Sequence, residues 1–199
     1  MPKLVDHEER RAHIIDALLR SAADSGLHSV TMRSVAVEAG VSVRLVQYYF
    51  DTKEQLLLAA MTRLGARMGE RIQHRLRSTG SAASPRSVIE AVLLEAVPTT
   101  EESRAFHLIY TEYAVLSVTD PTLGPLAAPD EMEAFLTAQL TAARLTAARP
   151  ADASFDPGHE AALLLATSAG LGLSVLLGQR TPEDATAVLR YHLARILPA

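Results

Sequence analysis

Arg44 and Gln47 stand three positions apart in a segment, residues 43–50, whose pattern favours a short helix. At about 100° per residue, one face of this helix comprises Val43, Arg44, Gln47 and Tyr48. The opposite, more apolar face comprises Leu45, Val46, Tyr49 and Phe50. Arginine and glutamine form bidentate hydrogen bonds to guanine and adenine edges, and valine can contact a thymine methyl. The first face therefore has the chemistry to bind bases in a DNA groove, and Tyr48 adds a ring for packing and a hydroxyl for phosphate.

The elements around this helix must position it. Thr31 is a suitable N-cap for a preceding short helix, and Ala36 and Ala39 on its apolar face are small enough for another helix to cross closely. Gly40 lies where a helix end needs a left-handed residue, and Ser42 can cap the next helix. Two helices joined by a tight turn within about twenty residues form a helix-turn-helix. The alternative, an ordinary solvated helix face, does not account for these flanking signals.

The stretch from Arg10 to Leu57 resembles the N-terminal domain of the TetR family of bacterial repressors. The residues that carry the resemblance are Arg10, Ile14, Ile15, Gly26, Thr31, Arg33, the A-x-x-A-G-V-S run at 36–42, Tyr49, Phe50 and the T-K-E-x-L run at 52–56. The resemblance implies that Thr31 and Arg33 lie near the DNA backbone, that Tyr48 lies in the groove or on a phosphate, and that Lys53 contacts a phosphate. It also implies a larger C-terminal domain that binds an effector and forms a dimer.

The recognition helix departs from the family pattern. Many members carry a basic residue at position 43, Gly or Pro at 44, Thr at 45 and Tyr at 47, where this chain has Val43, Arg44, Leu45 and Gln47. We therefore expect a different operator sequence. Lys53 has independent support, because it is one of only two lysines beside 17 arginines and stands at a helix N-terminus, which attracts anions.

Composition sets limits on function. The 199 residues are 48% hydrophobic and 21% charged, with a net charge of −4, which is typical of a soluble globular protein. A chain of this charge is no general polycation, so DNA binding must come from a local surface and from two copies of the domain. The chain has no cysteine and no apparent signal peptide, which favours the cytoplasm. No motif indicates catalysis, a metal site or a cofactor.

The patterning predicts an all-α protein of about nine helices. We expect a DNA-binding domain at 1–51, with a three-helix fold that contains the motif, and a helical effector-binding and dimerisation domain at 52–199. The first helix is expected at about 7–25, the fourth at 52–77, the sixth at 100–119 and the seventh at 130–149. The fifth, eighth and ninth begin at Ser84-Pro85, Asp156-Pro157 and Thr181-Pro182, in each case an N-cap followed by proline.

The eighth helix contains 18 uncharged residues, 161–178, which reaches the length of a membrane span. Its flanks carry no positive cluster or aromatic belt, so burial against protein is favoured over a membrane. In the family that this chain resembles, the last two helices of each subunit form a four-helix dimer interface. Close helix contact in a homodimer is therefore expected at small or apolar residues of this helix, namely Ala166, Ala169, Gly170 and Leu173, and Gly172 is also small enough for a close approach.

Helices four to seven are expected, by the same resemblance, to hold a small and largely apolar effector. The candidates are Met61, Leu64, Met68, Phe106, His107, Tyr110, Tyr113, Phe135 and Gln139. For each apolar residue among them, ordinary core packing is the alternative. An i, i+4 stripe of Arg63, Arg67, Arg71 and Arg75 follows the fourth helix, and we interpret its distal part as a solvated face.

These observations predict a ligand-responsive, DNA-binding transcriptional regulator, a repressor that an effector releases from double-stranded operator DNA. The alternative is a ligand-independent, DNA-binding architectural or interaction protein without a working pocket. A thermal shift with a metabolite library distinguishes them, because only the first is stabilised by a ligand that also releases DNA.

Overall fold

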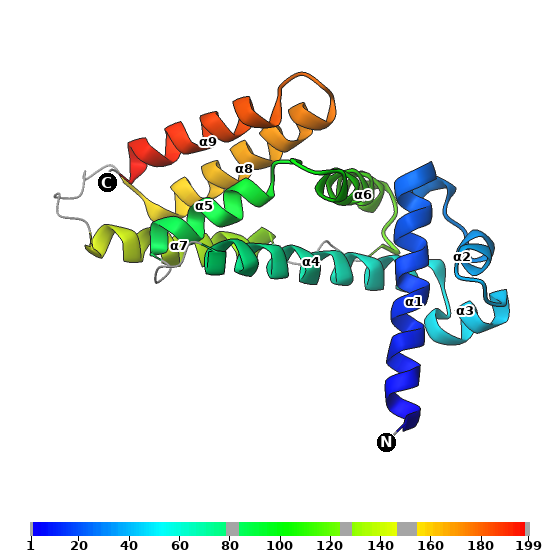
Figure 1. Cartoon of the computed structure of the whole chain (residues 1–199). Coiled ribbons are helices and arrows are strands. Elements are labelled where there is room, and N and C mark those ends of the chain that lie inside the picture. Colours follow the sequence, from blue (N-terminus) through cyan, green and yellow to red (C-terminus); the bar gives the residue numbers. More distant parts are fainter. Residues whose placement is uncertain (1, 79–83, 124–128, 147–154, 198–199) are drawn as a thin grey trace. The chain divides into compact units, whose positions relative to one another are not determined.

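The computed structural model describes residues 2–78, 84–123, 129–146 and 155–197. Within these ranges it contains helices and turns and no strand, which confirms the predicted all-α class. The α-helices, labelled in Figure 1, are α1 (Pro2–Ser25), α2 (Met32–Glu38), α3 (Val43–Phe50), α4 (Lys53–Ser78), α5 (Pro85–Glu95), α6 (Glu101–Thr119), α7 (Pro129–Thr146), α8 (Pro157–Leu176) and α9 (Pro182–Ile196). A 3-10 helix, η1 (Leu27–Ser29), lies between α1 and α2 in the chain.

Side-chain caps begin most of the predicted helices. The hydroxyl of Ser84 accepts a hydrogen bond from the backbone N–H of Ser87 at the start of α5. The Asp156 carboxylate does the same at α8, and the Thr181 hydroxyl at α9. Each cap satisfies an amide that has no partner within its helix, and the proline that follows has no N–H to satisfy. The three predicted cap-proline starts are therefore confirmed.

Two bounds differ from those expected. Helix α1 begins at Pro2 rather than near His7, because proline is well suited to the first turn of a helix and residues 3–6 contain no helix breaker. Helix α7 ends at Thr146, before the expected position 149, and residues 147–149 lie outside the described part of the chain. The segments between the expected helices, 78–83 and 120–129, also lie partly outside it. The 3-10 helix η1 was not predicted.

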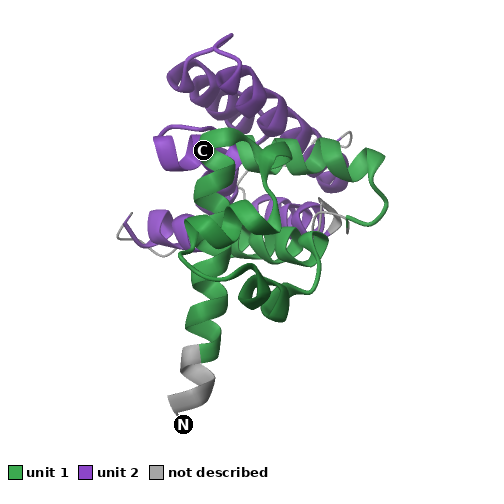
Figure 2. Cartoon of the chain, turned by 90° about the vertical axis from the view of Figure 1, so that its right-hand side faces the viewer, with its two compact units in different colours: residues 1–67, 108–127 green, residues 68–107, 128–199 purple. Residues whose placement is uncertain are grey.

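The chain divides into two compact units, coloured separately in Figure 2. Unit 1 contains residues 1–67 and 108–127, and unit 2 contains residues 68–107 and 128–199. Both α4 and α6 contribute residues to each unit. This division describes packing. The functional boundary between residues 51 and 52 stays a prediction.

Unit 1 contains the three N-terminal helices, where α2 packs against α1 and α3 packs against α2. Its fully buried side chains include Leu18, Leu27 and Phe50. Polar contacts fix the same helices, because a ring nitrogen of His13 lies 2.9 Å from the Ala39 carbonyl oxygen at the end of α2. Burial and these contacts together hold the helix-turn-helix on α1.

Unit 2 is a bundle in which α5 contacts α7, α8 and α9, and α8 contacts α7 and α9. Its core includes Ile89, Leu136, Leu164 and Leu189, one from each of the four helices. At one point the packing is backbone against backbone. A Cβ added to Gly172 of α8 would collide with the carbonyl oxygen of Ala96, the residue that ends α5. Glycine is therefore required at this crossing.

Candidate functional site

The helix-turn-helix has the local geometry that the sequence predicts. The Thr31 hydroxyl accepts a 3.0 Å hydrogen bond from the Ser34 N–H, and the Ser34 hydroxyl accepts one of 2.9 Å from the Thr31 backbone N–H, which completes a capping box. Gly40 has a φ of +65°, the left-handed conformation expected at the end of α2. Ser42 then caps α3 by accepting from the Leu45 N–H at 3.2 Å. Local signals therefore fix both helices and the turn.

The recognition helix α3 separates its two faces as expected. Val46 and Phe50 are buried, and the neighbouring Leu45 and Tyr49 are half-buried. On the other face Arg44, Gln47 and Tyr48 are exposed, with Val43 half-buried beside them. The three polar side chains therefore remain accessible while the apolar face holds the helix in unit 1. Their contacts with bases stay a prediction.

Tyr48 and Tyr49 of α3 form an aromatic cluster with His7 of α1. The rings of Tyr48 and Tyr49 meet edge to face with centroids 5.3 Å apart, and the ring of His7 from α1 lies 4.6 Å from Tyr49. Tyr48 keeps 72% of its surface exposed. Edge-to-face packing restricts the ring of Tyr48, so its hydroxyl is presented to solvent from a supported position.

The remaining predicted DNA contacts lie on unit 1. Thr31 and Arg33 are exposed at the start of α2, and Lys53 is half-buried in the first turn of α4. The hydroxyl of Thr52 accepts from the Gln55 N–H at 3.2 Å, so the predicted start of α4 is capped. Lys53 therefore lies where backbone amides already favour an anion.

Two arginines of α4 bind one carboxylate within unit 1, a group that we call the Asp16 cluster. Arg63 forms a bidentate pair with Asp16 through Nε and Nη2, at 2.6 and 2.8 Å. Nη2 of Arg67 donates to the same carboxylate at 2.7 Å. Burial acts to raise the pKa of Asp16, but the Arg63 hydrogen bond and the charges of Arg67, Arg63 and Arg20 outweigh it and lower the pKa. The carboxylate is therefore held in its charged form.

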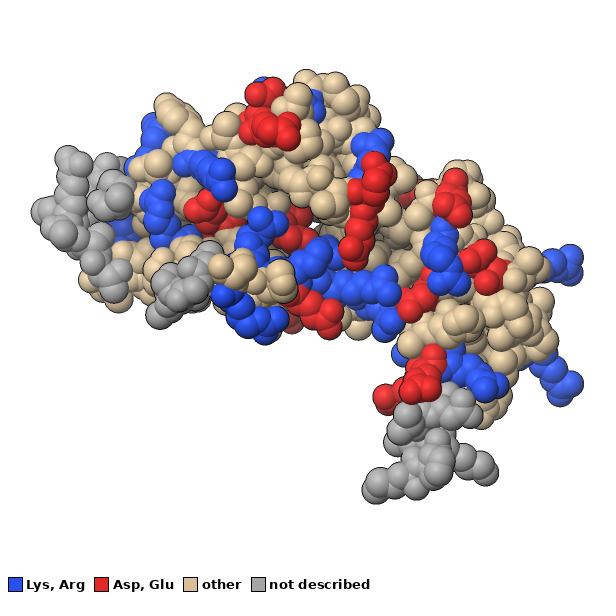
Figure 3. Space-filling model, viewed as in Figure 1, with Lys and Arg blue, Asp and Glu red and all other residues tan. Residues whose placement is uncertain are grey.

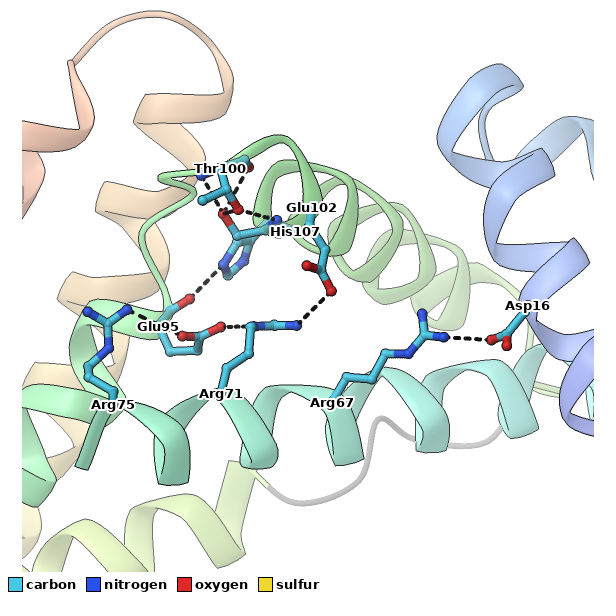
Figure 4. Close-up of polar contacts among 9 residues, drawn as sticks. Asp16, Arg67, Arg71, Arg75, Glu95, Thr100, Glu102 and His107 are labelled. Atoms are coloured by element: carbon cyan, nitrogen blue, oxygen red, sulfur yellow. Dashed lines mark hydrogen bonds and ion pairs between the residues drawn. The ribbon is translucent and has the colours of Figure 1, made fainter. Parts of the chain in front are cut away.

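The next two arginines of α4 lie in unit 2 and bind a buried carboxylate. Nε of Arg71 donates to Glu95, and Nη2 of Arg75 lies 3.6 Å from the other oxygen of Glu95 (Figure 4). Glu95 is only 4% exposed. The prediction that this part of the arginine stripe is a solvated face was wrong, because the sequence pattern of α4 alone does not reveal the buried Glu95 that faces it. On the face drawn in Figure 3, Lys and Arg side chains gather along α4 with acidic side chains beside them.

His107 and Phe106 of α6 complete this group, which we call the Glu95 cluster and define as Arg71, Arg75, Glu95, Phe106 and His107. Nε2 of His107 lies 2.9 Å from the Glu95 carbonyl oxygen. Burial lowers the pKa of His107, against the opposing effects of this hydrogen bond and of the Glu95 charge. The guanidinium carbon of Arg71 lies 5.3 Å from the centroid of the Phe106 ring. Two of the predicted effector residues, Phe106 and His107, therefore belong to a cluster that contains charged side chains.

The other predicted effector residues are divided between the units. Met61, Leu64 and Tyr113 are buried in unit 1, where Tyr110 is 41% exposed. In unit 2, Met68 and Gln139 are half-buried and Phe135 is 43% exposed. The rings of Phe106 and His107 meet edge to face, with their centroids 5.0 Å apart. An effector site at these residues stays a prediction.

A second carboxylate of unit 1, that of Glu112, ties α6 to η1. Glu112 accepts hydrogen bonds from the backbone N–H groups of Leu27 and His28, at 2.6 and 2.8 Å, and from His28 Nδ1 at 2.9 Å. Burial acts to raise the pKa of Glu112, but these hydrogen bonds lower it. This contact was not predicted, because Glu112 and Leu27 are 85 positions apart in the sequence. Glu112 acts as a side-chain cap for η1.

Helix α8 leaves a stripe of small and apolar residues uncovered in this chain. The four predicted dimer residues, Ala166, Ala169, Gly170 and Leu173, are all exposed. Leu163 and Leu177 extend the stripe and are 54% and 62% exposed. Gly172 differs, because it packs against α5 of the same chain. Helix α8 is also long and apolar enough to cross a membrane. Core helices of soluble proteins can have the same length and composition, so this property alone is weak evidence for a membrane span.

Comparison with protein families decides the classification. A model described as "Bacterial regulatory proteins, tetR family" matches residues 14–60. A second, described as "BetI-type transcriptional repressor, C-terminal", matches residues 85–198, more than half of the chain. The chain belongs to the TetR family. Its helix-turn-helix and helical bundle are the N-terminal and C-terminal parts of a TetR-family protein.

Curated relatives of this TetR-family chain are regulators. It is 36% identical to the HTH-type transcriptional regulator PksA of Bacillus subtilis over 52% of this chain and 49% of that protein. It is 33% identical to the HTH-type transcriptional regulator BetI of Burkholderia lata over 62% of each. The chain thus spans about half to three-fifths of the length of the curated relatives that it matches.

Solved structures of the family share the whole fold. A putative TetR-family regulator from a Rhodococcus species superposes with a TM-score of 0.80 at 25% identity, over 96% of this chain and 99% of that one. A putative regulator from Saccharomonospora viridis, solved in complex with choline, gives 0.73 at 24% identity, over 94% and 95%. The multidrug binding protein EbrR, solved with imidazole, gives 0.63 at 26% identity, over 96% of each.

Proposed function

We propose that this TetR-family protein is a transcriptional regulator that binds operator DNA through α3. The observation that carries this proposal is the exposed face of α3, where Arg44, Gln47 and Tyr48 project from a helix fixed by the Ser42 cap and by buried Val46. Arginine and glutamine are the side chains that best distinguish guanine and adenine in the major groove. The regulator names of PksA and BetI support the same function.

Two substitutions separate base recognition from backbone contact. Operator fragments are first selected from random DNA with the purified protein. Arg44→Ala should then weaken binding to the selected fragment by about 1 to 3 kcal/mol per half-site and relax base preference there. Lys53→Ala should weaken binding to all sequences and reduce the slope of log K against log salt by about one unit per subunit.

The control is Arg180→Ala, which removes an exposed arginine beyond the C-terminal end of α8. It should leave both the affinity and the salt slope unchanged. An equal loss on selected and random DNA for Arg44→Ala would contradict a role in base recognition. An unchanged salt slope for Lys53→Ala would remove Lys53 from the interface.

The protein acts as a homodimer through α8. Leu163, Ala166, Gly170, Leu173 and Leu177 follow one another at spacings of three and four residues, and all are exposed in the single chain. This is the repeat by which two helices pack along a common seam, and small residues in it permit close approach. A mildly acidic protein needs two recognition helices on successive major-groove faces, about 34 Å apart, for useful affinity.

Gly170→Leu tests the dimer without disturbing the subunit. A Cβ at Gly170 meets nothing within 4 Å in its own chain, and the residue is exposed, so we expect a larger side chain there to be tolerated by the subunit and to clash with a partner. Light scattering should show a dimer for the natural chain and a monomer for the variant, because overpacking costs about 1 to 3 kcal/mol. Operator affinity should fall at the same time while circular dichroism stays unchanged. A dimeric Gly170→Leu protein would refute this interface.

The regulator is a cytoplasmic repressor that a small molecule releases from DNA. Two residues separate the end of α3 at Phe50 from the start of α4 at Lys53, and α4 continues to Ser78, so a ligand-dependent shift in its second half can reach the recognition helix. Such a shift needs a ligand that prefers the conformation unable to bind DNA. In a thermal-shift screen, compounds that raise the melting temperature should also release the selected operator fragment. Stabilising ligands that leave DNA bound would contradict this mechanism.

A further inference from the structure

The Glu95 cluster has a charge imbalance within unit 2. The guanidinium groups of Arg71 and Arg75 share the single buried carboxylate of Glu95. Another carboxylate, that of Glu102, lies 3.8 Å from Nη1 of Arg71, but its side chain is 73% exposed and therefore well screened by water. The two guanidinium groups thus exceed the buried carboxylate by one positive charge, although the side chains of Arg71 and Arg75 keep 26% and 42% of their surface exposed.

Hydrogen-bond donors of the same arginines are left over. Nη2 of Arg71 and Nε of Arg75 are buried and have no hydrogen-bond partner among the described residues. Guanidinium nitrogens are donors only, and buried donors are nearly always paired. The missing group must therefore be an acceptor, and an anionic oxygen satisfies both the donors and the charge.

The neighbouring groups specify more of the ligand. With Nε2 of His107 donating to the Glu95 carbonyl oxygen, Nδ1 of the neutral ring is left as an acceptor. Phe106 offers an aromatic face beside Arg71. A cation would meet the surplus positive charge and would have to displace an arginine from Glu95. The neighbourhood therefore suits an acid with an apolar body.

We propose that the Glu95 cluster binds the carboxylate of an amphipathic organic acid, and that such acids are the effector class of this regulator. Arg71 and Arg75 hold the carboxylate, Glu95 positions the two arginines, and Phe106 packs against the apolar part. The effector class rests on the regulator function proposed above, whereas the binding site itself does not. The expected largely apolar effector is thereby refined to one with a single acidic group.

Isothermal calorimetry on the full-length dimer tests the binding site. The probes are straight-chain carboxylates from butanoate to decanoate and phenylacetate, with phenylacetamide as the neutral match and choline as the cation. Carboxylates should bind, and phenylacetamide should bind at least about tenfold more weakly than phenylacetate, the value of one charge-assisted hydrogen bond. Binding of choline without carboxylates, or of acid and amide alike, would overturn the proposal, as would no binding by any acid.

Two variants distinguish the site from general folding effects. Arg71→Lys keeps the charge that pairs with Glu95 but removes the forked donors, so carboxylate affinity should fall about tenfold or more while the melting temperature stays close to that of the natural chain. Arg75→Gln should lower it by a similar factor. Arg180→Gln is the matched control and should bind as the natural chain does. Unchanged affinity in both Arg71→Lys and Arg75→Gln would refute the assignment.

The same samples separate this inference from the function on which it rests. The selected operator fragment is titrated by fluorescence anisotropy with and without the tightest-binding acid. Release of DNA by the acid, lost in Arg71→Lys, is the expected result. DNA binding with no carboxylate binding would refute the effector class and leave the regulator intact. Carboxylate binding with no DNA binding would refute the regulator and leave the site.

Discussion

Two consecutive pairs of arginines on α4 differ in how completely their carboxylates satisfy them. In the Asp16 cluster a partly exposed carboxylate receives three hydrogen bonds of 2.6 to 2.8 Å from Arg63 and Arg67. In the Glu95 cluster a buried carboxylate receives one hydrogen bond from Arg71 and a 3.6 Å ion pair from Arg75, and two buried donors have no partner among the residues that the structure describes. Among the described residues, neither Arg63 nor Arg67 has a buried donor without a partner, whereas Nη2 of Arg71 and Nε of Arg75 still need a hydrogen-bond acceptor.

Loss of the Glu95 charge should have the largest effect on stability. Glu95→Gln removes the buried carboxylate that pairs with Arg71, and breaking a buried pair costs about 3 kcal/mol, whereas the loss at the 42% exposed Arg75 is reduced by solvent screening. Urea denaturation at pH 7 measures the free energy of unfolding. Glu102→Gln is the control, because its exposed carboxylate should contribute close to nothing. Equal losses in the two variants would show that burial does not distinguish them.

Asp16→Asn should lower the free energy of unfolding by somewhat less, about 2 kcal/mol. The substitution weakens the hydrogen bonds from Arg63 and Arg67, and the site is partly exposed to solvent. The cost should depend on pH. Because the pKa of Asp16 is lowered in the folded chain, its contribution is present above the ordinary pKa near 4 and is lost as pH falls through the lower folded value. Natural chain and variant should therefore converge once the pH falls below the lowered pKa of the folded chain. A difference that persists there would contradict the assignment.

His107→Leu should cost about 1 kcal/mol, the value of one neutral hydrogen bond. Its pKa is lowered by burial, so the unfolded chain binds a proton at a higher pH than the folded chain does. The natural chain should therefore lose stability as pH falls below about 6.5. His107→Leu should remove this slope and leave the acid transition of Asp16 in place. A slope that remains in the variant would point to another histidine.

Arg67→Ala should have the smallest effect, about 0.5 kcal/mol, because Arg63 retains its bidentate pair with Asp16 and Arg67 is partly exposed. In contrast, Arg75→Ala should change the binding of carboxylate probes as well as stability. Thermal denaturation of the two variants with and without phenylacetate measures both effects. A response to phenylacetate that is lost in Arg67→Ala but kept in Arg75→Ala would reverse the roles of the two clusters.

Local features of the fold were predictable because each depends on a few adjacent residues. The caps at Thr31, Ser42 and Ser84 and the left-handed Gly40 follow from side-chain chemistry within four positions. The two faces of α3 follow from helical periodicity alone. The starts and types of the elements could therefore be derived from the sequence without knowledge of tertiary contacts.

The carboxylates that complete the clusters could not be derived in this way. Glu95 is 24 positions from Arg71, and Glu112 is 84 and 85 positions from its partners His28 and Leu27. Periodicity on α4 showed that the arginines share a face, but an exposed stripe and a buried ion pair have the same pattern. One signal was present, because Glu95 ends the apolar run Ala91–Leu94 on α5. An acid in such a place needs a partner when buried.

The crossing at Gly172 bears on how this protein could acquire a new specificity. The contact joins Gly172 to the backbone of Ala96, the residue next to Glu95, so it is unaffected by which side chains surround the cluster. Natural drift or a combinatorial library can therefore vary positions 106 and 107 while the end of α5 keeps its place on α8, whereas Arg71 and Arg75 are constrained by the buried carboxylate of Glu95. Position 172 itself should tolerate only glycine in such a library. The backbone contact between Gly172 and Ala96 thus holds the end of α5 in place independently of the side chains at positions 106 and 107.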